Sequence, residues 1–97
     1  MNYTFHPEAE REMQDSINYY EGCQEGLGYE FAREVYKAIE SILEYPKAWP
    51  LFEEDIRRRL IHRFPYCILY SDEINEIYIL AIMHLNRSPN YWKTRLK

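Results

Sequence analysis

Apolar residues recur at helical spacing through the first half of the chain, in two stripes. The first stripe predicts a helix that begins at Pro7 and ends near Gly22 or Gly26. The second predicts a helix that begins near Leu27 and that Pro46 stops. The stripes consist of Ala9, Met13, Ile17 and Tyr20, and of Leu27, Phe31, Val35, Ile39 and Ile42. Because only a few residues separate the two helices, we expect an antiparallel helical hairpin.

The hydrophobic period changes to two in the second half of the chain, which is typical of strands. Arg57–Phe64 alternates with neither face purely apolar, so one side of this strand meets solvent or a partner. Pro65 then indicates a sheet edge or a bulge. Tyr66–Tyr70 and Glu76–Leu85 are apolar on both faces and predict a central hairpin, with its turn at Ser71–Asn75.

The remaining segments complete the expected order β-α-α-β-β-β. Asn2–His6 predicts a short first strand, Lys47–Asp55 a loop, and Asn86–Lys97 a polar end with a short helix. We therefore expect an α+β fold in which the helical hairpin packs on a twisted antiparallel sheet, as one domain over residues 1–97.

Composition supports a small globular protein with a single core, since 46% of its 97 residues are hydrophobic and 29% are charged. No apolar run reaches the roughly 18 residues that a membrane span needs, and the N-terminus is not a secretory signal. We therefore expect a cytoplasmic protein with two reduced thiols, Cys67 in the core and Cys23 exposed.

Charge is distributed unevenly along the chain. Met1–Glu54 carries a net charge of −8 and Asp55–Lys97 a net charge of +4, within an overall charge of −4. The second half could therefore meet an anionic partner, although two solvated faces of opposite sign would give the same pattern.

Local motifs for cofactors and metals are absent from the sequence. There is no glycine-rich phosphate loop, no zinc-type cysteine pair and no HExxH pattern, and we expect neither a cofactor nor a metal. His6, His62 and His84 could converge only through the fold, and the carboxylate pairs on the helices are typical of solvated faces.

An arginine cluster is the first candidate site. Arg57, Arg58 and Arg59 precede Arg63, and an extended strand would place Arg57, Arg59 and Arg63 on one face. Such a row binds phosphate or carboxylate groups well. Charged residues of this kind also protect a sheet edge from aggregation, so the pattern alone leaves both interpretations open.

The second candidate site follows the last strand. It combines an imidazole, guanidinium groups, a phenol and an indole, in the order His84, Arg87, Tyr91, Trp92 and Arg95. These groups could bind RNA, with arginine on phosphate, the aromatic rings on bases and histidine in proton transfer. Equally, the segment could hold its aromatic residues over the end of the sheet and serve only as structure.

Two stretches carry a resemblance to a known family. Residues 56–70 (IRRRLIHRFPYCILY) and 78–95 (YILAIMHLNRSPNYWKTR) resemble the ParE-like plasmid stabilisation toxins of the RelE/ParE superfamily. The first half agrees, with an A-x-x-E/D-like first helix, the pair Tyr19–Tyr20, and Leu27-Gly28 before Phe31. The ordered set covers nearly the whole chain.

The resemblance implies the toxin component of a type II toxin–antitoxin system, without a cofactor. Its partner would be a ParD-like antitoxin, part of which folds along the toxin, and its target DNA gyrase. No direct sequence-specific binding to nucleic acid is expected. The implied contacts with target or antitoxin are Arg57, Arg58, Arg59, Arg63, Arg87, Tyr91, Trp92 and Arg95.

Members of this superfamily differ in their activity. RelE-like members cut mRNA on the ribosome through a basic surface, and that activity would assign catalysis to Arg63, His84, Arg87 and Tyr91. This chain departs from that pattern, because Phe52–Asp55 is acidic where such a nuclease would carry lysines. We therefore expect a gyrase poison rather than an enzyme, with an mRNA endoribonuclease or a non-toxic binding module as the alternatives.

Overall fold

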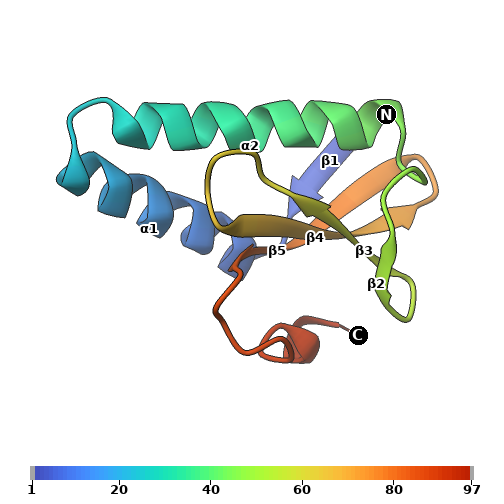
Figure 1. Ribbon diagram of the computed structural model, residues 1–97. Coiled ribbons are helices and arrows are strands. Elements are labelled where there is room, and N and C mark those ends of the chain that lie inside the picture. The colour runs from blue at the N-terminus through green and yellow to red at the C-terminus, as the bar shows by residue number, and fades with distance from the viewer. Residues whose placement is uncertain (1, 97) are drawn as a thin grey trace.

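Two helices cover one face of a five-stranded sheet in the computed structural model, which describes residues 2–96 (Figure 1). In chain order the elements are β1 (Asn2–Phe5), α1 (Pro7–Cys23), α2 (Leu27–Glu44), β2 (Leu51–Glu53), β3 (Ile56–Leu60), β4 (Tyr66–Glu73), β5 (Glu76–His84) and the short 3-10 helix η1 (Lys93–Arg95). The predicted α+β class, the helical hairpin and the central pair of long strands are confirmed.

The sheet is mixed rather than antiparallel. Its strand order is β1-β5-β4-β3-β2, and β1 runs parallel to β5 while every other neighbouring pair is antiparallel. The expectation of an antiparallel sheet was wrong for this one strand. Hydrophobic periodicity identifies the residues that form a strand, but it carries no information about the direction in which that strand joins a sheet.

The predicted strand Arg57–Phe64 is shorter and earlier than expected. β3 ends at Leu60, and the chain bends through the following residues before β4 begins at Tyr66. Arg63 has a φ of 76°, which an extended strand does not allow, so it leaves the face that Arg57 and Arg59 share. The predicted loop Lys47–Asp55 also contains β2, a short edge strand that pairs with β3.

The helical hairpin is closed by two glycines with different roles. Gly26 immediately precedes α2 with a φ of 87°, a left-handed conformation that glycine adopts without strain. Gly28 lies against α1, where a Cβ atom would stand 2.6 Å from the carbonyl oxygen of Ile17. The Glu21 carboxylate accepts hydrogen bonds from the backbone N–H groups of Gly26, at 2.9 Å, and Gly28, at 3.0 Å. Glu21 therefore satisfies amides at the start of α2 that lack helical partners.

Apolar cores lie on both faces of the sheet. The first is between the sheet and the helices, and it contains the predicted stripes of α1 and α2. The second is on the opposite face, where the C-terminal segment, red in Figure 1, crosses the sheet. A bulge between β4 and β5 leaves Leu80 as an extra residue, so Leu80 and Ala81 both join the second core. Cys67 is buried there as expected, and Cys23 is exposed.

Candidate functional site

The C-terminal segment is anchored by Trp92. Its side chain is 1% exposed within the second core, and its ring centroid lies 6.2 Å from that of Phe52 on β2. The indole Nε1 donates a hydrogen bond of 2.6 Å to the carbonyl oxygen of Pro89. Lys93 of η1 also forms an ion pair with Glu53 of β2. Trp92, one of the residues expected to contact a partner, is therefore covered by the protein itself.

Glu12 of α1 binds the same segment through its carboxylate. Arg95 donates to it at 2.7 Å from Nη2 and 3.0 Å from Nη1, and the Tyr91 hydroxyl donates at 2.7 Å. Burial, and then the hydrogen bond to Glu12, raise the pKa of Tyr91 well above its usual value. Burial is the largest single influence on the pKa of Arg95 and lowers it. The hydrogen bond to Glu12 and the nearby charges, chiefly that of Glu12, together outweigh burial and raise the pKa.

This ion pair also occupies an open sheet edge. β1 covers only Glu76–Ile79 of β5, which leaves the remainder of that edge without a neighbouring strand. There the Glu12 carboxylate accepts from the N–H of Ile82, and Arg95 donates to the carbonyl oxygen of Leu80, both at 3.0 Å. Two side chains thus supply the acceptor and the donor that a strand would have supplied.

Glu12 was not predicted as a site residue from the sequence. Glu12 belongs, with Glu8, to the carboxylate pairs that were interpreted as solvated helix faces, because periodicity assigns a polar residue to a face but not to a partner. The A-x-x-E/D-like pattern contained the relevant information, because Ala9 is fully buried and Glu12 stands three positions after it.

The arginines of β3 point to opposite faces of the sheet. Arg57 donates from Nη1 to the carbonyl oxygen of Trp49 at 2.7 Å. Arg59 donates from Nε to Ser41 Oγ at 3.0 Å, and its guanidinium lies 4.3 Å from the Trp49 ring centroid. Burial lowers the pKa of Arg59. Arg57 and Arg59 therefore attach the connection between α2 and β2 to the sheet.

Arg58 and Arg63 have other surroundings. Arg58 is on the face of the second core, with its guanidinium 5.1 Å from the ring centroid of Phe52. Arg63, in the bend after β3, forms an ion pair of 2.6 Å with Glu30 of α2. The four arginines are thus distributed over three environments and do not form the predicted row.

His84 lies apart from the tyrosine that a nuclease mechanism would use. It is paired with Tyr66 across β4 and β5, with ring centroids 5.0 Å apart, and its Nδ1 accepts from the N–H of Asn86 at 3.0 Å. Arg87 is exposed and stacks on Tyr91, 3.9 Å from the ring centroid. Of the proposed catalytic residues, the described side-chain contacts bring together only Arg87 and Tyr91, although the backbone N–H of Arg87 also donates to the carbonyl oxygen of His84 at 3.0 Å.

Metal binding and membrane insertion gain no support within residues 2–96. No group of three histidine, cysteine or acidic side chains there is arranged to hold a metal ion. Neither of the helices in that range combines the length and apolarity that crossing a membrane requires.

Comparison with known proteins gives a family and a fold. A family model described as "ParE toxin of type II toxin-antitoxin system, parDE" matches residues 3–89. Among solved structures, the chromosomal ParDE toxin–antitoxin system from P. aeruginosa contains a similar chain, with a TM-score of 0.74 and 14% sequence identity. The match covers 89% of this chain and 97% of that one. No curated protein matches the sequence.

Proposed function

We propose that this chain, which belongs to the ParE toxin family of type II toxin–antitoxin systems, arrests bacterial growth by binding DNA gyrase. A ParD-like antitoxin would neutralise it. The family match supports the toxin class. The resemblance of residues 56–70 and 78–95 to ParE-like toxins supports gyrase as the target.

The observation that carries this proposal is the hydrogen bond from the Tyr91 hydroxyl to Glu12. A general acid or base must exchange its proton near the working pH. The Tyr91 hydroxyl instead donates to Glu12, and its raised pKa makes its proton still harder to remove than that of an ordinary tyrosine. Arg63 is paired with Glu30, and His84 lies beside Tyr66. These contacts support action by binding rather than by bond cleavage.

Arg58 and Arg87 are the proposed contacts with a partner. Each guanidinium stacks on an aromatic ring, Phe52 and Tyr91 respectively, and neither forms an ion pair with another residue in the range 2–96. A stacked guanidinium keeps its N–H edge available for carboxylates of a second protein. Arg57, Arg59, Trp92 and Arg95 would then position this surface rather than contact the partner.

Controlled expression in a bacterium tests the proposal, with a DNA-damage reporter and the rate of protein synthesis followed together. We expect growth arrest in which the damage reporter rises before protein synthesis falls. Purified gyrase should accumulate cleaved DNA in the presence of the protein. The double variant Arg58→Ala/Arg87→Ala should lose most of its toxicity, while Arg33→Ala, which removes an exposed arginine from α2, should keep it.

Other outcomes would contradict the proposal in distinct ways. If protein synthesis falls first while DNA stays intact, the protein acts on mRNA and the candidate nuclease residues become the targets for mutagenesis. If growth continues normally, the chain is a non-toxic member that acts only as a binding module. In either case the family assignment stands, because it rests on the sequence match.

A further inference from the structure

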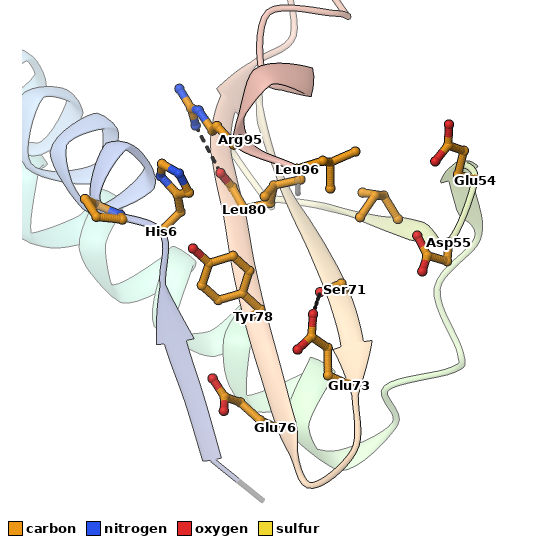
Figure 2. A pocket seen from close by; sticks show the side chains of 12 residues that line it. His6, Glu54, Asp55, Ser71, Glu73, Glu76, Tyr78, Leu80, Arg95 and Leu96 are labelled. Carbon is orange, nitrogen blue, oxygen red and sulfur yellow. Dashed lines mark hydrogen bonds between the residues drawn. The ribbon is translucent and has the colours of Figure 1, made fainter.

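A cleft opens on the sheet face opposite the helices, beside the C-terminal segment (Figure 2). Its volume is about 860 Å³. Its apolar part includes Ile56, Tyr78 and Leu80, and both Ile56 and Leu80 belong to the second core. Figure 2 shows His6 at the side where α1 begins, with Arg95 and Leu96 of the C-terminal segment above. The cleft therefore continues the apolar face that Trp92 covers farther along the sheet.

Carboxylates surround this apolar floor. Glu54 and Asp55 come from the turn between β2 and β3, while Glu73 and Glu76 stand at the hairpin end of β4 and β5. Within residues 2–96, none of these side chains forms an ion pair. Glu73 accepts a hydrogen bond of 2.9 Å from Ser71 Oγ, and Glu76 accepts one from Thr4.

Arg95 also lines the cleft, but its positive charge is already paired with the carboxylate of Glu12. Its guanidinium is paired with Glu12 at 2.7 Å and donates to the carbonyl oxygen of Leu80. The lining thus presents a negative potential around an apolar floor, although the second half of the sequence is basic overall. Such a surface repels nucleic acid and attracts cationic side chains.

We propose that this cleft binds an extended segment of the antitoxin in which lysine or arginine residues flank an apolar side chain. This inference rests on the toxin–antitoxin pairing proposed above. The C-terminal segment of the chain itself already binds the same sheet face in this manner, with an apolar anchor in Trp92 and a guanidinium on a carboxylate through Arg95. The proposed antitoxin segment would repeat that pattern in the neighbouring space.

The concave shape favours an antitoxin segment over the surface of a folded enzyme. A segment that folds on binding can follow a cleft and can extend over separate surfaces of one partner. It could contact Arg58, on this same face of the sheet, and reach the acidic cleft with another part of its length. A rigid protein surface would contact the rim and leave the floor uncovered.

Peptide binding provides the first test. The probes are a fluorescein-labelled hexapeptide of alternating lysine and leucine, and its counterpart with glutamate in place of lysine. We expect only the lysine peptide to bind, more weakly as salt rises from about 50 to 200 mM. The variant Glu54→Gln/Asp55→Asn/Glu73→Gln should weaken its binding on the order of 10-fold.

A matched variant separates the cleft from the net charge of the protein. Glu10→Gln/Glu25→Gln/Glu40→Gln removes the same number of charges from exposed positions on the helical hairpin and the turn that joins its helices. It should bind the lysine peptide as the natural protein does. Equal binding by both triple variants would overturn the proposal, because attraction would then depend on total charge.

The antitoxin itself provides the second test. The cognate antitoxin should displace the lysine peptide, and the cleft variant should bind the antitoxin on the order of 10-fold more weakly than the helical control. If antitoxin binds all three proteins equally and leaves the peptide in place, the inference is overturned while the pairing stands. If antitoxin does not bind the natural protein at all, the proposed pairing fails and the inference with it.

Discussion

At the scale of the residue, a single carboxylate joins three parts of the chain. Glu12 belongs to α1, and it binds Ile82 on β5 as well as Tyr91 and Arg95 in the C-terminal segment. The side chains of Glu12 and Arg95 are only 15% and 10% exposed, so water replaces few of these contacts when one partner is lost. Removal of either charge would leave the other buried and unpaired.

Glu12→Ala should therefore lower the free energy of unfolding by about 3 kcal/mol. Glu12→Gln should cost less, because an amide oxygen still accepts from Ile82 or Tyr91. Arg11→Ala is the control, since its ion pair with Glu8 is exposed and its loss should cost no more than about 0.5 kcal/mol. Urea unfolding followed by circular dichroism measures all three. A loss for Glu12→Ala no larger than for Arg11→Ala would contradict this role.

Sequence patterns predicted buried apolar residues more successfully than the partners of polar ones. The stripes of both helices are in the core, and Cys67 is buried where an apolar run placed it. Arg57 and Arg59 instead contact Trp49, and Glu12 contacts a segment near the other end of the chain. Such contacts depend on tertiary distances that no periodicity encodes.

At the scale of the element, the close contact between α1 and α2 is sensitive to a single substitution. Gly28→Ala would place a methyl group against the backbone of α1, 2.6 Å from the Ile17 carbonyl oxygen, and force the helices apart. We expect a loss of about 2 kcal/mol in unfolding free energy. Gly22→Ala meets nothing within 4 Å, and should instead stabilise α1 by about 0.5 kcal/mol. Chemical denaturation should give opposite signs for the two variants, and equal signs would refute the close approach.

Helix positions followed from the sequence, whereas the bounds and the pairing of the strands followed only in part. Proline and glycine marked the start of α1, the turn before α2 and the end of α2, and the structure confirms all three. The parallel pairing of β1 was missed because a strand of only four residues carries no indication of its direction. The bend after Leu60 depends on the positive φ of Arg63, which arginine rarely adopts and a pattern therefore does not predict.

Alkaline pH should destabilise the whole molecule. Burial raises the pKa of Cys67 to about 11 and that of Tyr70 to about 12, so the folded protein holds both protons more tightly than the unfolded chain does. Their contribution to stability is complete below the unfolded values of 9.0 and 10.0, and is lost as pH rises through the folded values. Unfolding free energy should therefore fall between about pH 9 and 12.

Two cysteine variants isolate one part of that pH dependence. Cys67→Ala should give a shallower decline between about pH 9 and 11 than the natural protein, whatever its stability at neutral pH. Cys23→Ala removes the exposed thiol and should keep the natural slope. Denaturation midpoints measured across this range provide the comparison. An unchanged slope in Cys67→Ala would show that the buried thiol does not govern alkaline stability.

The parallel pairing of β1 with β5 also has a consequence for biosynthesis. β5 lies between β1 and β4 in the sheet, yet it follows all the other described strands in chain order. Until it emerges, the strand at the start of the chain has no neighbour and the helical hairpin has no complete sheet to cover. The sheet is therefore completed only after β5 has been made, and a nascent chain that ends before β5 cannot yet form the complete fold.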